Sequence, residues 1–462
     1  MNFELGSFRD PAGKVFYEEK KVFRYVTTQG QKKYEYIKSN GILNDSIKDG
    51  YLIETREIKD EKIKSQISNC KYILQHQLID FISYPYEWSF NQLKDAALHH
   101  LNYQIYLLEK NAILIDGSAY NIQFIGTKPI FIDVLSIGEY RDGMYWYGHK
   151  QFCENFLNPL LLSSKKEIYF NNWFKGNLEG IFTSDLNSIL NFIDKLSPTI
   201  FLQVFMLNKL ENKTILDPNK SSKKLKKLRN FSKKSYMSLL YQMKKTIKKL
   251  EPYKRKSVWE NYSKQNTYTK EEEILKIKTV KDFVLKNNFN LIADVGCNDG
   301  LYSFASLESG CKKVVGFDFD LNVVDRAYLE AKNKNHSFLP LYLDASNPSS
   351  NIGWNETERK GLKQRFNFDG LIALAIEHHL AISKNIPLDQ TIDWLTSFAP
   401  KGLIEFVPKE DETVQSMIIL KGDIFPNYTE ENFIKFLGNK TKIISSTKVS
   451  SSGRKLFEYA RI

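Results

Sequence analysis

The stretch LIADVGCNDGLY, from Leu291 to Tyr302, places an apolar run and an acid before a loop with two glycines. The run 291–295 has the length and composition of a buried strand, and the residues from Leu301 onward favour a helix. Gly296 and Gly300 carry no Cβ, so the backbone between them can turn tightly and approach a ligand. This order predicts a nucleotide-like ligand at the carboxyl end of the strand, facing the amide-rich N-terminus of the helix.

Strand-like and helix-like segments alternate through the whole C-terminal block, residues 270–462. The further apolar segments are VVGFD (314–318), FLPLYLD (338–344), FDGLIALAI (368–376) and GLIEFVP (402–408). Helical sequence lies between most of them. The alternation predicts an α/β fold, in which helices cover both faces of a parallel sheet.

The spacing of the glycines distinguishes between a dinucleotide and another nucleotide-like ligand. A dinucleotide-binding loop reads GxGxxG, and here Asn298 stands where the middle glycine would be. The pattern D-x-G-x-[GN]-x-G matches Asp294, Gly296, Asn298 and Gly300, so the block resembles class I S-adenosylmethionine (SAM) methyltransferases. The resemblance implies a Rossmann-like sheet with SAM as its cofactor. The alternative is an α/β domain whose strand ends are polar because loops are polar.

The resemblance also implies a role for each acid at a strand end. Asp294 would lie near the amino-acid end of the cofactor, Asp318 would bind both ribose hydroxyls, and Asp344 would bind the adenine amine. The expected cofactor-binding residues are Asp294, Gly296, Cys297, Asn298, Gly300, Asp318, Phe319, Asp344 and Ala345.

Three polar residues follow the fourth apolar segment: Glu377, His378 and His379. In the resembled family this edge faces the methyl group and its acceptor. A hydroxyl acceptor must lose a proton, and a histidine with a pKa near neutrality can take it. Among the three we favour His379 as the catalytic base; the alternative is that the histidines only cap the strand. No Asp/Asn-Pro-Pro-Tyr follows, which disfavours methylation of a planar nitrogen.

The N-terminal block, residues 1–210, contains a second motif. Asp116, Asn121 and Asp133 have the spacing of the catalytic and metal-binding residues of protein kinases and aminoglycoside phosphotransferases, which the block resembles. An α+β, kinase-like domain would then bind the acceptor, regulate the methyltransferase, or transfer phosphate itself. The motif departs from that family, because Leu114-Ile115 precedes the first acid and Val134-Leu135 follows the last. The alternative is an Asp-Gly turn that Asn121 caps.

The whole chain resembles a bacterial group of class I methyltransferases that accompany nodulation and surface-polysaccharide genes. The resemblance is carried by SYPYEWSF (83–90), DGSAYNIQF (116–124) and ALAIEHHL (373–380). It implies a glycan or glycolipid acceptor, methylated on a hydroxyl, in preference to RNA or protein. The aromatic residues of the first block would suit stacking on sugars, although such residues more often pack in a core. They are Tyr84, Tyr86, Trp88, Trp146 and Tyr147.

A basic segment, residues 211–269, is expected to link the two blocks. The chain has a net charge of +12, and the stretch 213–256 alone holds 16 Lys/Arg against two acids. Such a stretch could bind RNA or an anionic membrane surface, or it could be a solvated helical linker. Lysine predominates over arginine, which favours the linker. Partial helical spacing is kept by Leu225, Leu228, Met237, Leu240 and Met243.

The remaining composition limits the class of protein. Four scattered cysteines form no CxxC pair and no metal-ligand spacing, so we expect neither a disulfide framework nor a metal site. The N-terminus lacks a secretory signal, and no apolar run is long enough to span a membrane. These features predict a cytoplasmic enzyme.

Overall fold

Seven strands of the C-terminal half form one sheet in the order β12-β11-β10-β13-β14-β16-β15. This is a computed structural model that describes residues 1–144, 146–206, 208, 232–253 and 268–462. The strands from β10 to β14 are parallel, whereas β16 runs antiparallel to β14 and β15. The parallel α/β sheet predicted from the sequence is confirmed. Its strands are β10 (Leu291–Val295), β11 (Lys313–Asp318), β12 (Phe338–Tyr342), β13 (Gly370–Ala373), β14 (Lys401–Phe406), β15 (Thr441–Lys448) and β16 (Lys455–Arg461).

Alternate residues of each strand point to opposite faces of the sheet, and the two faces have different partners. In β10, Ile292 packs in a core with apolar residues of α13, α14 and α15. Its neighbours Leu291 and Ala293 belong to a second core that includes α16, α18 and the N-terminal half. The helices are α13 (Lys270–Asn287), α14 (Leu301–Glu308), α15 (Leu321–Lys334), α16 (Leu388–Thr396), α17 (Glu412–Lys421) and α18 (Glu430–Gly438).

The N-terminal half begins with a five-stranded antiparallel sheet in the order β1-β2-β3-β5-β4. The alternating segment KVFYEEKKVFRYV (14–26), which predicts a hairpin, forms β2 and β3, and the helical pattern FNQLKDAALHHLNYQIYLLEK (90–110) forms α4. Two short antiparallel pairs follow, β6 with β9 and β7 with β8. The strands are β1 (Asn2–Phe3), β2 (Gly13–Glu18), β3 (Lys21–Val26), β4 (Thr55–Ile58), β5 (Tyr72–His76), β6 (Ala112–Leu114), β7 (Ile122–Ile125), β8 (Lys128–Phe131) and β9 (Ile137–Glu139).

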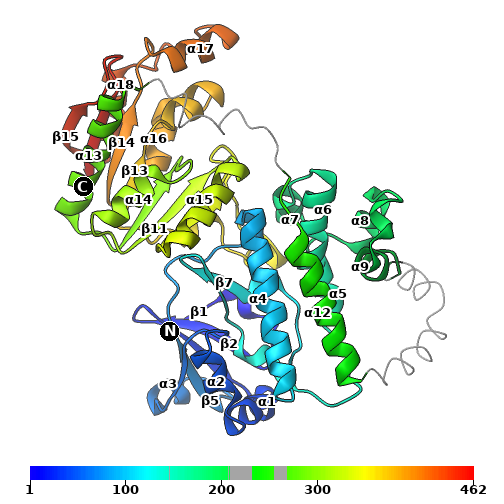
Figure 1. Cartoon of the computed structure of the whole chain (residues 1–462). Helices are drawn as coiled ribbons and strands as arrows, with labels where there is room; N and C mark the ends of the chain where they lie inside the picture. Colours follow the sequence, from blue (N-terminus) through cyan, green and yellow to red (C-terminus); the bar gives the residue numbers. More distant parts are fainter. Residues whose placement is uncertain (145, 207, 209–231, 254–267) are drawn as a thin grey trace.

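Helices complete the N-terminal half, and α4 lies beside α15 of the C-terminal half (Figure 1). They are α1 (Thr28–Ser39), α2 (Ile42–Lys48), α3 (Glu61–Ser65), α4 (Phe90–Glu109), α5 (His149–Phe152), α6 (Asn158–Lys166), α7 (Asn171–Gly176), α8 (Thr183–Ile189), α9 (Pro198–Ile200) and α12 (Lys233–Lys249).

Buried polar contacts join the two halves. The Arg365 guanidinium donates to both carboxylate oxygens of Glu87, at 2.5 and 2.9 Å, and both side chains are buried. The amide of Gln92, also buried, donates to the carbonyl of Pro340 at 3.0 Å. Since the apolar core is also continuous across the junction, the N-terminal half covers one face of the C-terminal sheet.

The motif SYPYEWSF lies at this junction. Tyr84, Tyr86, Trp88 and Trp146 are all buried, so they pack in the core and are not available to stack on sugars. Tyr147 is 72% exposed.

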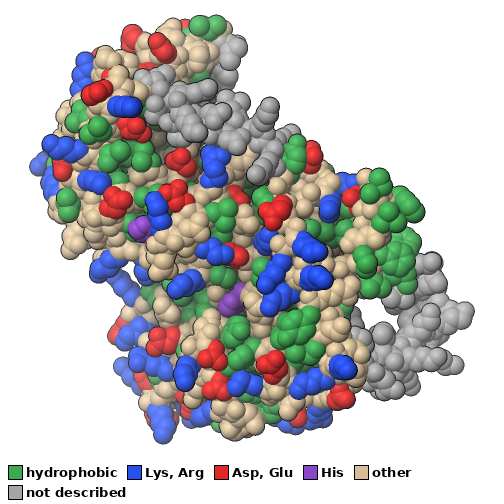
Figure 2. Space-filling model, in the orientation of Figure 1, with side chains coloured by type: hydrophobic (Ala, Val, Ile, Leu, Met, Phe, Trp, Pro, Cys, Tyr) green, Lys and Arg blue, Asp and Glu red, His purple; other side chains and the backbone are tan. Residues whose placement is uncertain are grey.

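The described part of the basic segment contains α12, which packs against α4. Leu240 and Met243 are buried in that contact, while Leu225 and Leu228 lie outside the described residues. On the face shown in Figure 2, Lys and Arg side chains are interspersed with Asp and Glu. An anionic partner for this segment stays a prediction. No helix in the described ranges is long and apolar enough to cross a membrane.

Candidate functional site

The loop between β10 and α14 has a left-handed backbone at three of its residues. The φ angles are 82° at Gly296, 48° at Asn298 and 92° at Gly300. A Cβ on Gly300 would lie 2.6 Å from the ring of Phe338, so the packing and the backbone angle both require glycine there. Gly300 is also the N-cap residue of α14, whose first turn therefore points its free amides toward the loop.

The acid at the end of β11 is tied to this loop. The Asp318 carboxylate accepts hydrogen bonds from the backbone amides of Asn298, at 2.9 Å, and Asp320, at 3.0 Å. Loss of water raises the pKa of Asp318 to about 6, and these amides oppose the rise. Above that pH the side chain is a carboxylate whose remaining lone pairs can accept further hydrogen bonds.

Asp294, the acid of β10, lies deeper. It is 1% exposed and accepts a hydrogen bond from the Ser303 hydroxyl at 2.6 Å. Burial raises the pKa of Asp294 to about 7, against the effect of that hydroxyl. The neighbouring Cys297 side chain is buried in the core beneath α14, so only its backbone can face a ligand.

The third acid, Asp344, follows β12 at the same edge of the sheet. It is half-buried and accepts hydrogen bonds from the backbone amide and the hydroxyl of Ser346, at 3.0 and 2.6 Å. Ala345 beside it is also half-buried. Phe319, which follows Asp318, is 56% exposed although its ring is apolar. The structure thus brings the loop, three acids and an exposed aromatic ring to one edge of the sheet.

Glu377 and the two histidines follow β13, where Ala375 has a left-handed φ of 52°. This segment lies against the glycine loop, because a Cβ on Gly296 would be 3.3 Å from the side chain of Ile376. Glu377 is buried; its Oε1 accepts from the Val407 amide at 3.0 Å and from the Tyr428 hydroxyl at 2.8 Å. Burial raises the pKa of Glu377 to about 8, so it holds its proton at neutral pH.

The rings of His378 and His379 lie 4.3 Å apart. His378 is fully buried, and neither of its ring nitrogens has a hydrogen-bond partner among the described residues. His379 is half-buried; burial and the Arg454 charge lower its pKa to about 4. The sequence-based expectation of a pKa near neutrality is therefore not met, because burial and the nearby Arg454 charge both disfavour the protonated imidazole. Both imidazoles are neutral at pH 7.

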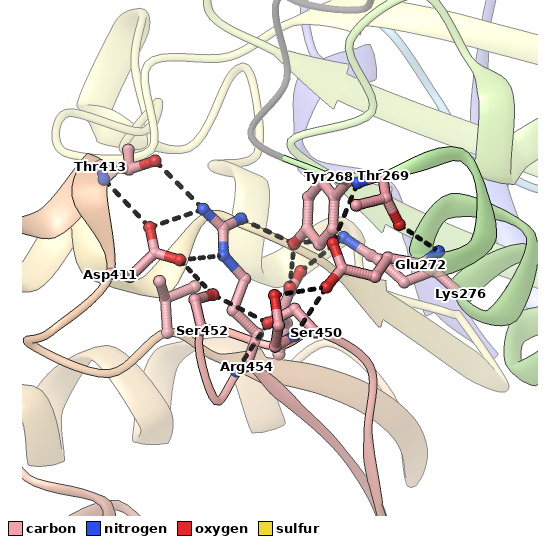
Figure 3. A network of polar contacts seen from close by, with 12 residues as sticks. Tyr268, Thr269, Glu272, Lys276, Asp411, Thr413, Ser450, Ser452 and Arg454 are labelled. Carbon is pink, nitrogen blue, oxygen red and sulfur yellow. Dashed lines mark hydrogen bonds and ion pairs between the residues drawn. The ribbon is translucent and has the colours of Figure 1, made fainter.

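A buried ionic network stands next to the histidines (Figure 3). Arg454 donates to both oxygens of Asp411, each at 2.7 Å, and to the Tyr268 hydroxyl at 2.6 Å. Lys276 donates to Glu405 at 2.9 Å, and Tyr268 donates to the other oxygen of Glu405. The network joins the start of α13, the end of β14 and the turn before β16, so it fixes one wall of the site.

The kinase-like residues lie in the N-terminal half, between the short strand pairs. The Asp116 carboxylate accepts from the Ser136 hydroxyl at 2.6 Å, and burial raises its pKa. Asn121 ends a short 3-10 turn before β7. Asp133 forms an ion pair with Arg24 of β3 at 2.5 Å, and Arg24 also pairs with Asp10. A kinase-like domain stays a prediction.

Sequence reasoning missed the ionic network. Arg454 is 186 residues from Tyr268 and 43 residues from Asp411 in the sequence. No local pattern therefore indicates that these side chains meet.

The network predicts a large loss of stability when one charge is removed. In Arg454→Met, the buried Asp411 carboxylate would lose its counter-ion, and we expect the free energy of unfolding to fall by about 3–5 kcal/mol. Urea denaturation measures this change. The control is Lys334→Met, which removes an exposed pair with Glu330 and should leave the free energy of unfolding nearly unchanged. Equal losses in the two variants would contradict the assignment.

Known proteins were compared with the chain in three ways. No protein-family model matches it. Among solved structures, magnesium protoporphyrin IX methyltransferase from Synechocystis PCC 6803, with bound adenosylhomocysteine, is 18% identical, with a TM-score of 0.31 over 41% of this chain and 84% of that one. The N-methyltransferase NodS from Bradyrhizobium japonicum WM9 is 12% identical, with a TM-score of 0.31 over 41% and 96%.

A curated relative matches the chain from end to end. Nodulation protein NoeA of Rhizobium meliloti (strain 1021) is 40% identical over 461 residues, which are 99% of this chain and 95% of the relative. The protein therefore belongs to the family of nodulation protein NoeA.

Proposed function

We propose that the protein is a SAM-dependent methyltransferase. One observation carries the proposal: a left-handed glycine loop and three strand-end acids meet at the carboxyl edge of a sheet with the class I strand order. In parallel α/β sheets, ligands bind at this edge. In this loop Asn298 stands where GxGxxG places the glycine that lets the backbone approach a pyrophosphate, which favours a nucleoside ligand without phosphate.

The side chains of Asp318, Phe319 and Asp344 each have a place in this scheme. Asp318 would accept the two ribose hydroxyls through the lone pairs that the Asn298 and Asp320 amides leave free. The exposed ring of Phe319 would stack on adenine, and Asp344 would accept its amine. Gly296 and Gly300 would let the chain pass close to the methionine portion.

When bound, SAM supplies an activated methyl group on its sulfonium. The protein must hold the acceptor in line with that group and exclude water. His379, half-buried next to the glycine loop and neutral at pH 7, would accept the proton of an acceptor hydroxyl. His378 and Glu377 are buried behind it, and their role would be to position His379. Burial and the Arg454 charge keep the His379 imidazole unprotonated at pH 7, and burial, with the charges of Arg454 and Lys276, does the same for His378.

The proposed acceptor is a hydroxyl of a glycan or glycolipid. This proposal rests on the resemblance of the sequence to the nodulation and surface-polysaccharide group.

The cofactor assignment predicts that adenosylhomocysteine binds to the wild-type protein and not to Gly296→Val or Asp318→Ala. The valine would clash with Ile376 and could not adopt the left-handed backbone, and the alanine would remove the ribose acceptor. Titration calorimetry measures both affinities.

Matched controls are Gly438→Val, at a glycine with open space around its Cα, and Asp389→Ala, at an exposed acid of α16. Both should bind as the wild type does. Binding of wild-type strength in Gly296→Val and Asp318→Ala would refute the proposed site.

The catalytic assignment predicts that His379→Ala binds adenosylhomocysteine normally but transfers no methyl group. The assay uses SAM labelled in its methyl group and host lysate separated into glycan, lipid, RNA and protein fractions. Label is expected in the glycan or lipid fraction. The control is His336→Ala, at a histidine of the helix–strand turn before β12. Label in RNA or protein would overturn the acceptor class, and full transfer by His379→Ala would overturn the base.

We further propose that the N-terminal half follows a kinase-like chain path but transfers no phosphate. Support comes from its five-stranded sheet with α1 between β3 and β4, and from the paired strands that flank Asp116 and Asn121. In the resembled enzymes, the acid equivalent to Asp133 holds Mg²⁺. Here the guanidinium of Arg24 pairs with that acid directly, so the positive charge is already supplied by the protein.

Titration with Mg-ATP tests this second proposal. We expect no heat of binding and no ATP turnover from a preparation that binds adenosylhomocysteine. Mg²⁺-dependent turnover that disappears in Asp133→Ala would contradict the proposal and would establish a phosphotransferase in the N-terminal half.

A further inference from the structure

A short segment of the N-terminal half runs along the proposed cofactor edge. The Tyr169 hydroxyl donates to the Asn322 side chain of α15 at 3.4 Å, just beyond Asp318 and Phe319. The side chain of Asn172 lies near the Tyr342 hydroxyl at the end of β12 and lowers its pKa, against the larger effect of burial. The Lys175 ammonium donates to the carbonyl of Asn347, three residues beyond Asp344, at 3.0 Å.

These three residues are spaced by three, at positions 169, 172 and 175. Residues three apart lie on the same side of a helix, and the last two belong to α7. One side of this segment therefore faces the carboxyl ends of β11 and β12, the part of the edge where the adenine end of the cofactor is proposed to bind.

The segment is held firmly in this position. The buried amide of Asn171 donates to the carbonyls of Tyr86, at 3.0 Å, and Trp88, at 2.9 Å. Phe170 and Phe174 are buried in the N-terminal core on the other side of the segment. The segment 169–175, which forms a wall beside this edge of the sheet, is thus anchored to SYPYEWSF (83–90). The same motif contributes Glu87 to the junction between the halves.

The side chains of this wall complement those of the edge. Asp344 can only accept hydrogen bonds when ionised, which suits the amine of adenine. Adenine also has ring nitrogens that accept, and these need donors. Lys175 and Asn172 supply donors next to Asp344, and the Asp344 charge acts on the Lys175 ammonium, whose pKa burial lowers.

We infer, on the basis of the proposed function, that the adenine end of the cofactor binds between the two halves of the chain and that Lys175 is a positioning residue for adenine. The C-terminal sheet supplies the ribose acid and the amine acceptor. The N-terminal half supplies the outer wall and the donors. The cofactor pocket is therefore incomplete in the C-terminal half alone.

Hydrogen exchange of the full chain, with and without adenosylhomocysteine, tests the wall directly. We expect slower exchange in peptides covering residues 169–176 as well as in those covering 294–300 and 317–320. Protection confined to the C-terminal peptides would overturn the inference and leave the proposed function intact. If no peptide is protected and calorimetry shows no binding, the proposed function itself fails.

Calorimetry on variants tests the role of Lys175. Lys175→Ala should weaken adenosylhomocysteine and 5′-methylthioadenosine by the same factor, about tenfold, because both ligands contain the adenine. Lys175→Arg should restore most of the affinity, and Lys165→Ala, at an exposed lysine of α6, should have no effect. Unchanged affinity in Lys175→Ala, with the melting temperature of the wild type, would overturn the assignment. So would a loss limited to adenosylhomocysteine.

Discussion

The loop from Gly296 to Gly300 can exist only because glycine occupies both of its ends. Its backbone is left-handed at three residues, and the ring of Phe338 fills the space where a side chain on Gly300 would lie. This close packing sets the start of α14 and places the Asn298 amide against the Asp318 carboxylate. The strand ends, the helix N-terminus and the acid are therefore fixed relative to one another by a single turn, and the proposed cofactor chemistry depends on that turn.

The N-terminal half is part of the same structural unit. Its core is continuous with one face of the C-terminal sheet, and the buried pair of Arg365 and Glu87 crosses the junction. Removing one member of such a pair lowers the free energy of unfolding, because the other member is left as a buried charge without a counter-ion. The segment after Asp344 runs directly into the junction between the halves, and α7 of the N-terminal half lies along the adjoining strand ends. The N-terminal half can therefore contribute to the proposed cofactor site without itself containing a catalytic residue. The match to nodulation protein NoeA covers both halves of the chain.

The sequence predicted the parts of the molecule that local patterns determine. The five parallel strands could be recognised from their apolar runs, and the loop from the spacing of Asp294, Gly296, Asn298 and Gly300. The N-terminal β-hairpin and α4 were also predictable from periodicity. The antiparallel β15 and β16 were not, because their polar alternation resembles surface sequence. Burial was harder still: the sequence left open whether Trp88 and Tyr86 stack on sugars or, as is more usual, pack in a core, and only the tertiary structure shows them in the core. The low pKa of His379 could not be foreseen either, since it depends on burial and on the charge of Arg454, which is 75 residues away in the sequence.

The most direct test of the central claim is a crystal structure of the full chain grown with adenosylhomocysteine. The account predicts density for the ligand over the glycine loop, with the ribose hydroxyls on Asp318, adenine between Phe319 and Asp344, and the sulfur directed toward His379. An empty edge under saturating ligand, or a ligand bound at another place in the molecule, would contradict it.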